Sequence, residues 1–292
     1  MKTIVGLVFF ALMTGSAIAA GTPEQIWKKE IADGNYAWAK APHAILKIQD
    51  AAYLGEGQSA TLTGIKGKPD SWHWVQGEKK GALVARYKGG KLNVRKDGKT
   101  FDIAAVAKGI PIDKDVEIVG APTQVAAGVM GVRIMVFNQQ AKAAKDFTGV
   151  DFYPYDPAYR VGATFKADPK RTPRVFRTSR GTDKEFFHAG DAVFSLKGKT
   201  FTLPLYSDEQ KKITGMSAFF TDALTNIETY GAGRYVDVEP FGAFPPRKVT
   251  IDFNFAYNPN CARSPFFTCP VATDDIALAI KAGERDPHKK HS

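Results

Sequence analysis

Residues able to do chemistry concentrate between positions 228 and 270 of this 292-residue chain. Apolar and polar side chains alternate over residues 249–255, which predicts a strand with one buried face. Asp252 and Asn254 then point together to the opposite face, and the Asn-Pro steps that follow end the strand. Their carboxylate and amide could contribute to a polar site, or could simply face water.

More polar residues flank this predicted strand on both sides. The tripeptide 231–233, Gly-Ala-Gly, lets the backbone approach other groups closely. We therefore expect Arg234 to meet Asp252, either in a ligand site or in a structural ion pair. The candidate ligand-binding residues supply carboxylates, phenols, amides and a guanidinium: Glu228, Tyr230, Arg234, Asp252, Asn254, Tyr257 and Asn258.

Three functions fit this set of polar residues. They could bind a small polar, anionic or glycan-like ligand. They could form a hydrolase or lyase site, in which Asp252 or Glu228 acts as general acid/base and Arg234 stabilises a developing anion. They could also pair with one another in a purely structural module. The sequence points to no cofactor.

The two cysteines, Cys261 and Cys269, lie in one Pro-flanked loop. In an exported protein a disulfide is the default state of such a pair, and it is our expectation. A metal site would need two further ligands, and His73 and His188 are the best candidates, without ligand spacing. A reactive thiol would need a neighbour that lowers its pKa, and no His or Lys is adjacent in sequence.

These motifs resemble a known family. Three features carry the resemblance: the run Asp252-Phe253-Asn254-Phe255-Ala256-Tyr257-Asn258-Pro259, the pairs Cys261-Ala262 and Cys269-Pro270, and the ending Ala282-Gly283-Glu284. Together they resemble the bacterial and archaeal family called domain of unknown function 1684. Segments 228–235 and 147–161 resemble it as well, so the resemblance covers most of residues 147–284. The family has no established activity, and the resemblance therefore implies no catalytic residue.

The first residues predict export. Lys2 precedes an apolar run, and Ala17-Ile18-Ala19 fits the small-x-small cleavage pattern, so residues 1–19 read as a secretory signal peptide. We expect an exported, periplasmic or extracellular protein that is soluble and does not span the membrane. Its composition, with 44% hydrophobic and 24% charged residues, is that of a globular protein and excludes collagen-like or disordered chains.

The rest of the sequence predicts a mainly β fold. Thr22, Pro23 and Gln25 mark the start of a short helix that we expect to end near Gly34. Short strands separated by Gly and Pro turns follow at intervals of about ten residues, which is typical of sandwich or barrel-like β-units. Among them we expect a strand over 101–106 and hairpin turns at Gly89-Gly90 and Asp97-Gly98. The expected organisation is a helix plus a small β-unit over 20–147, a second β-unit over 148–284 and a disordered tail over 285–292.

One stretch of the sequence is strongly basic. The chain carries a formal net charge of +10, and residues 166–184 contain seven Lys or Arg against two Asp. Export and the lack of aromatic residues between the cations argue against nucleic acid as a partner. The stretch is either a solvated loop or a surface that attracts anionic envelope material such as a phosphorylated glycan.

Overall fold

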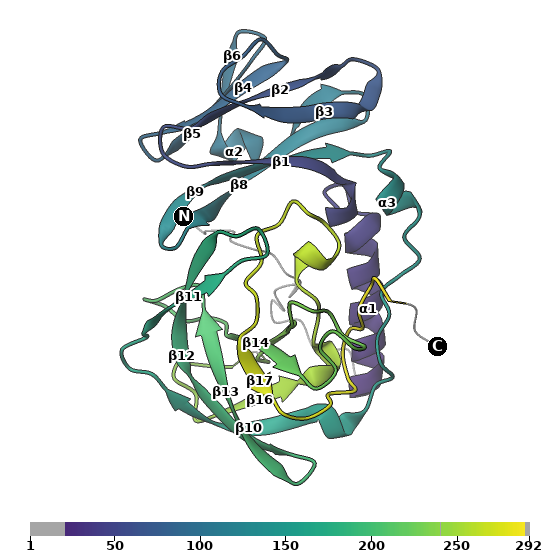
Figure 1. The fold of residues 1–292 in the computed structure, drawn as a ribbon, viewed down its shortest axis with the longest axis vertical. Helices are drawn as coiled ribbons and strands as arrows, with labels where there is room; N and C mark the ends of the chain where they lie inside the picture. Colours follow the sequence, from purple (N-terminus) through teal and green to yellow (C-terminus); the bar gives the residue numbers. More distant parts are fainter. Residues whose placement is uncertain (1–20, 240, 290–292) are drawn as a thin grey trace. The chain divides into compact units, whose positions relative to one another are not determined.

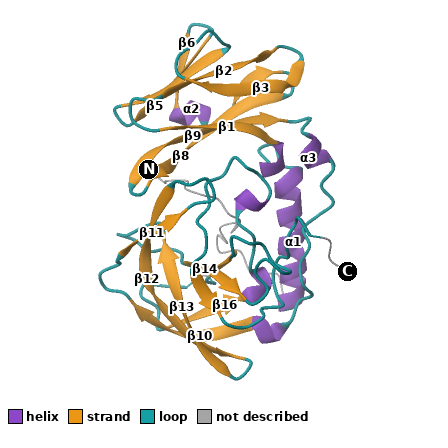
Figure 2. Ribbon diagram, in the orientation of Figure 1, coloured by secondary structure: helices purple, strands orange, loops and turns teal. Residues whose placement is uncertain are grey.

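The computed structural model describes residues 21–239 and 241–289 (Figure 1). The predicted signal peptide lies outside the described residues. The chain divides into two compact units, one formed by Glu30–Thr148 and the other by Thr22–Lys29 together with Gly149 and the residues that follow it. Strands dominate both units, and one long helix lies near the N-terminus (Figure 2), so the mainly β fold is confirmed.

Helix α1 spans Pro23–Ala39 and begins as the sequence predicts. The Thr22 amide donates to Gln25 Oε1 over 2.8 Å, and the Gln25 amide donates to Thr22 Oγ1 over 3.3 Å, which is a capping box. The predicted end at Gly34 is wrong. One glycine inside a helix costs only about 1 kcal/mol, and Ala39 in the last turn is buried against Leu46.

The first unit contains two antiparallel sheets. One has the order β1-β9-β8-β7 and the other the order β3-β2-β4-β5-β6. The strands are β1 (Ile48–Leu54), β2 (Ser59–Ile65), β3 (Lys68–Gln76), β4 (Leu83–Lys88), β5 (Lys91–Lys96), β6 (Lys99–Asp102), β7 (Ile110–Asp113), β8 (Val116–Ala126) and β9 (Val129–Asn138). Apolar residues of both sheets form one buried cluster, as in a sandwich.

Local turn chemistry explains most of this unit. The predicted hairpins at Gly89-Gly90 and Asp97-Gly98 join β4 to β5 and β5 to β6, and all four residues have positive φ. The predicted strand over 101–106 is wrong in its second half. Asp102 accepts a hydrogen bond from the Ala105 amide and starts a short helix, α2 (Ile103–Val106). Short helical turns at Ile45–Lys47 and α3 (Lys142–Lys145) complete the unit.

The second unit is built on one eight-stranded sheet. Its order is β15-β14-β13-β12-β10-β16, with β11 paired to β12 and β17 paired to β14. The strands are β10 (Arg160–Ala167), β11 (Pro173–Arg177), β12 (Asp183–Leu196), β13 (Lys199–Ser207), β14 (Ser217–Asp222), β15 (Arg234–Asp237), β16 (Lys248–Asp252) and β17 (Asp274–Ile276). Only the β14–β17 pair is parallel among these strands. Figure 1 shows that β10, β12 and β13 curve around a core.

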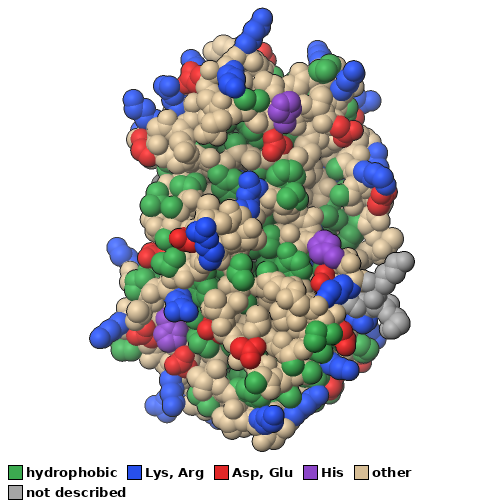
Figure 3. Space-filling model, in the orientation of Figure 1, with side chains coloured by type: hydrophobic (Ala, Val, Ile, Leu, Met, Phe, Trp, Pro, Cys, Tyr) green, Lys and Arg blue, Asp and Glu red, His purple; other side chains and the backbone are tan. Residues whose placement is uncertain are grey.

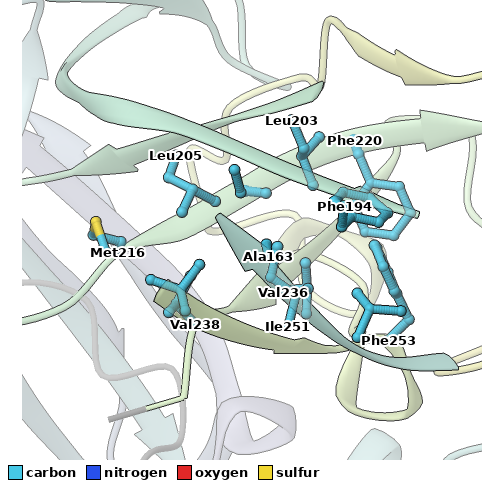
Figure 4. Packing of buried hydrophobic residues seen from close by; sticks show 14 of the residues in the cluster. Ala163, Phe194, Leu203, Leu205, Met216, Phe220, Val236, Val238, Ile251 and Phe253 are labelled. Carbon is cyan, nitrogen blue, oxygen red and sulfur yellow. The ribbon is translucent and has the colours of Figure 1, made fainter. Parts of the chain in front are cut away.

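That core corrects the predicted strand over 249–255. Strand β16 ends at Asp252, and Phe253–Phe255 form one turn of 3-10 helix capped by the Asp252 carboxylate. Ile251 and Phe253 are fully buried beside Phe220 and Phe194 (Figure 4). Phe255 is only half-buried, since the turn breaks the period of two on which the prediction rested.

The C-terminal residues are fixed, in contrast to the expected disordered tail. The Arg285 amide donates to Asp151 O over 2.9 Å and the Asp286 amide to Glu228 O over 3.0 Å. The tail prediction is therefore wrong for residues 285–289, while residues 290–292 lie outside the described chain. No helix within residues 21–239 and 241–289 is long and apolar enough to cross a membrane.

Candidate functional site

Arg234 belongs to a buried ion pair and not to a ligand site. It opens β15, and only 1% of its surface is exposed. Its Nη2 atom donates to Asp222 Oδ2 over 2.6 Å and to Ile280 O over 3.0 Å, and its Nη1 atom donates to Ala282 O. The expected pairing with Asp252 is thus wrong, because Asp222, at the end of β14, provides the carboxylate.

Asp252 and Asn254 form a second, separate network. Asp252 Oδ1 accepts hydrogen bonds from the Asn254 amide over 3.0 Å and from Asn254 Nδ2 over 2.8 Å, while Arg160 Nε lies 3.8 Å from Oδ2. Asn254 also exchanges two hydrogen bonds of 2.9 Å with the backbone of Asp156. Burial raises the pKa of Asp252. These contacts fasten the turn after β16 to the segment before β10.

Tyr257 completes a third pair, which is partly buried. Its hydroxyl donates to Asp237 Oδ1 over 3.2 Å, and Ser217 Oγ donates to the same oxygen over 2.5 Å. Burial raises the pKa of Asp237 and raises that of Tyr257 well above its ordinary value. The phenol is therefore a hydrogen-bond donor to the partly buried carboxylate at the end of β15.

Glu228 and Asn258 hold the C-terminal segment in place. Tyr153 donates to Glu228 Oε2 over 2.7 Å. Asn258 donates to the buried Glu284 twice, from its backbone N to Oε2 and from its Nδ2 to Oε1, both over 2.8 Å. Arg263 forms an ion pair with Glu284, whose pKa is raised by burial. Both candidate residues thus serve internal contacts.

The cysteines form a different kind of site. Both thiols are free, so the expected disulfide is not present, and the Cys261 amide donates to Cys269 Sγ over 3.3 Å. Cys261 is partly exposed, whereas Cys269 is buried. The Cys269 thiol also donates a hydrogen bond to the sulfur of Cys261. The pair is therefore a dithiol in which Cys261 is the less buried residue.

The Tyr230 hydroxyl lies beside the sulfur of Cys261, with 4.0 Å between oxygen and sulfur. The Ser179 hydroxyl donates to Phe267 O and accepts from the Cys269 amide, both over 3.4 Å. Hydrogen bonding with the Cys269, Ser179 and Tyr230 side chains favours the thiolate and lowers the pKa of Cys261 to about 6, with Cys269 contributing most. The shared proton and burial raise the pKa of Cys269 well above its ordinary value. Burial, followed by the charge of Cys261, raises that of Tyr230 to about 12.

The fold fixes the ends of the cysteine loop. Thr178 and Pro270 form an antiparallel bridge at the turn between β11 and β12. The Ser179 amide donates to Cys269 O and the Val271 amide to Arg177 O, both over 2.9 Å. At the other end Cys261 lies in a 3-10 turn, Asn260–Ala262, that follows Pro259. The two sulfurs therefore approach each other without a covalent bond.

Sequence reasoning found part of this arrangement. Tyr230 is the one predicted ligand residue that contacts a cysteine. Ser179 was missed, because it lies 90 residues from Cys269 and only the β11–β12 hairpin brings it there. Asp222 carried no signal in the sequence, while Glu284 stood in the family-like Ala-Gly-Glu ending but was not assigned a role.

Metal binding finds no support in the described residues. Within 21–239 and 241–289 no group of three or more His, Cys, Asp or Glu side chains is placed to hold a metal ion. His73 contacts Thr63, and His188 lies between Asp168 and Asp191. Neither histidine therefore makes a contact with the cysteines.

Comparisons with known proteins find a family model that matches part of the chain, but no activity. Residues 145–285 match the family model described as "Protein of unknown function (DUF1684)". The solution NMR structure of an uncharacterised protein of Haloarcula marismortui is 29% identical over 51% of this chain and 82% of its own, with a TM-score of 0.43. A search of curated proteins finds no match. Residues 145–285, which carry the dithiol, match the model of the DUF1684 family, as the resemblance predicted.

Proposed function

We propose that this protein is an exported thiol–disulfide exchange protein, in which Cys261 is the nucleophile and Cys269 the second, resolving thiol. The observation that supports this best is the placement of two free thiols together, with the Cys261 amide donating to Cys269 Sγ over 3.3 Å and the Tyr230 hydroxyl 4.0 Å from the Cys261 sulfur. Export remains a prediction from residues 1–19, and it would place the dithiol where disulfides form and persist.

The protonation states suit this chemistry. A thiol whose pKa is about 6 is roughly 90% thiolate at pH 7, whereas an ordinary cysteine is only a few per cent thiolate. The thiolate is the species that attacks disulfides. Cys261 is also the more exposed of the two residues, which suits it to the role of nucleophile.

The proposed exchange proceeds in two steps. The Cys261 thiolate attacks one sulfur of a substrate disulfide, forming a mixed disulfide and releasing the first substrate thiolate, which takes a proton from water. Cys269 then loses its proton and attacks the Cys261 sulfur, which releases the second substrate thiol. The protein dithiol is oxidised to a Cys261–Cys269 disulfide, and the substrate disulfide is reduced to two thiols.

The contacts of the polar residues argue against a hydrolase, a lyase or a binding site for an anionic or glycan-like ligand. A hydrolase or lyase with Arg234 as anion stabiliser needs a guanidinium that reaches substrate, yet Arg234 is buried against Asp222. A glycan-like or anionic ligand would have to displace internal partners of Asp252, Asn254, Glu228 and Asn258. These side chains are better explained as structural pairs.

Exchange with a small neutral disulfide tests the proposal. Reduced protein is mixed with hydroxyethyl disulfide at pH 7, and the products are identified by mass spectrometry with tryptic mapping. We expect the Cys261–Cys269 disulfide in the wild type, a trapped mixed disulfide on Cys261 in Cys269→Ser, and no adduct on Cys269 in Cys261→Ser. Reaction of Cys261 no faster than that of a free cysteine peptide at the same pH would refute the proposal.

A further inference from the structure

We infer that the turn between β11 and β12, residues 177–183, makes this dithiol selective for disulfides that carry carboxylates beside the reacting sulfurs. The inference rests on the proposed exchange activity and names its substrate class. It is carried by the position of a basic hairpin on the cysteine loop.

The turn touches the cysteine loop at several points. Ser179 donates from its backbone to Cys269 O over 2.9 Å, and its hydroxyl accepts from the Cys269 amide and donates to Phe267 O, both over 3.4 Å. The next residue, Arg180, donates from Nη1 to Pro265 O over 2.6 Å. Pro265 lies between the two cysteines in the chain, so the Arg180 guanidinium lies on the loop that carries the nucleophile.

The hairpin carries excess positive charge. Residues 166–184 include two acidic residues, Asp168 and Asp183, against seven basic ones: Lys166, Lys170, Arg171, Arg174, Arg177, Arg180 and Lys184. Asp183 is paired with Arg177, and Asp168 accepts the turn amides of residues 170 and 172. Glu185 follows directly and reduces the excess by one charge. The guanidinium-bearing residues 174, 177 and 180 are all exposed.

The positive charge of the hairpin also affects the pKa of a cysteine. The pKa of Cys269 is raised chiefly by its hydrogen bond with Cys261, and the ammonium of Lys184 opposes that rise. A thiolate alone would repel an anionic substrate, and the cations of the hairpin offset this repulsion. On the face drawn in Figure 3, basic side chains are scattered among acidic ones.

Attraction of this kind accelerates encounter. Clefts and patches of one charge raise association rates by about 10- to 1,000-fold for substrates of the opposite charge, and the effect falls steeply with salt. The screening length is about 10 Å at 0.1 M salt and about 3 Å at 1 M. A carboxylate within a few bonds of the reacting sulfur falls inside the first distance, so its charge must be felt during attack.

Three disulfides of similar size but different charge test the inference. Dithiodipropionate carries two carboxylates, hydroxyethyl disulfide is neutral and cystamine carries two ammonium groups. The second-order rate constant of Cys261 with each is measured at low salt and again near 1 M salt. We expect dithiodipropionate to react fastest and cystamine slowest, with at least about a tenfold spread that collapses at high salt.

Single substitutions test whether the basic residues of the hairpin cause the charge preference. Arg180→Glu and Arg177→Glu should each slow the reaction with dithiodipropionate several-fold and leave that with hydroxyethyl disulfide unchanged. Arg177 does not bond the cysteine loop through its side chain, so it separates charge from loop geometry. Lys91→Glu, at an exposed position of β5, makes the same change in net charge and should leave all three rates unaltered.

The outcomes separate the two proposals. If hydroxyethyl disulfide fails to react, the exchange function itself is wrong. If it reacts but the three disulfides share one rate, the function stands and the selectivity is overturned. An equal loss in Lys91→Glu and Arg180→Glu would also overturn the inference, because overall charge would then explain the preference.

Discussion

Arg234 Nη2 lies 2.6 Å from Asp222 Oδ2, and neither side chain exposes more than 1% of its surface. The guanidinium also lies over the Phe220 ring, 5.4 Å from its centroid. Burial lowers the pKa of Arg234, and the Asp222 carboxylate opposes that shift. A cation so far from water depends strongly on the Asp222 carboxylate, because burying an unpaired charge is very costly.

Removing Asp222 should therefore destabilise the protein severely. We expect Asp222→Ala to lower the free energy of unfolding by about 3–5 kcal/mol, the range for one lost partner of a buried ion pair. Asp252→Asn is the matched control, because its cationic neighbour Arg160 is largely exposed and stays solvated; it should cost about 1 kcal/mol. Urea titrations measure both. Equal losses of unfolding free energy in the two variants would mean that water reaches the Arg234 guanidinium.

Phe253 should contribute far more to stability than Phe255, although both lie in the same helical turn. Phe253 is fully buried, so Phe253→Ala should cost about 3–5 kcal/mol. Phe255 is half-buried, and Phe255→Ala should cost about 1 kcal/mol. Chemical denaturation of the two variants side by side checks the ranking, and the reverse order would show that the turn after β16 is placed wrongly.

The reactivity of Cys261 should titrate near pH 6. Since only the thiolate is alkylated, the iodoacetamide rate at Cys261, followed by peptide mass spectrometry, should rise through a midpoint of about 6. Tyr230→Phe removes a donor to the thiolate, so the midpoint should move to higher pH. Tyr36→Phe is the control, because Tyr36 is 60% exposed and distant in sequence. An unchanged midpoint in Tyr230→Phe would remove the phenol from the site.

Asp237 should make stability fall as pH rises. Burial raises its pKa in the folded protein, so the folded state binds its proton more tightly than the unfolded state does. The stabilising effect is complete below the unfolded pKa of 3.8 and is lost as pH rises through the folded pKa. Asp237→Asn lacks this loss. Its stability relative to wild type should therefore be greater at pH 7 than at pH 4, and a difference independent of pH would contradict the assignment.

What could be predicted from sequence was mostly local. The capping box of Thr22 and Gln25 and the Gly89-Gly90 hairpin depend on residues a few positions apart, and both formed as expected. The partner of Arg234 depends on strand order, which no local pattern encodes. The contact between Ser179 and Cys269 could not be predicted for the same reason, because Ser179 lies in a hairpin 90 residues before Cys269.

The prediction of a strand over 249–255 was wrong in its last three residues for a different reason. Alternation fits both a strand and a strand that ends in a turn, and the Asp252 carboxylate capping the Asn254 amide decides between them. The polar residues identified there are real features of the molecule, but they bind one another. Pattern alone could not distinguish internal partners from a ligand.

Helix α1 connects the beginning of the chain to its end. Its first turns belong to the second unit, where Trp27 Nε1 donates to Asn254 O over 2.9 Å and its ring contacts Phe152. Ribosomes deliver Trp27 among the first residues and Asn254 among the last. Folding during synthesis or translocation can thus complete residues 30–148 early, while the start of α1 must wait, unpacked, until nearly the whole polypeptide has emerged.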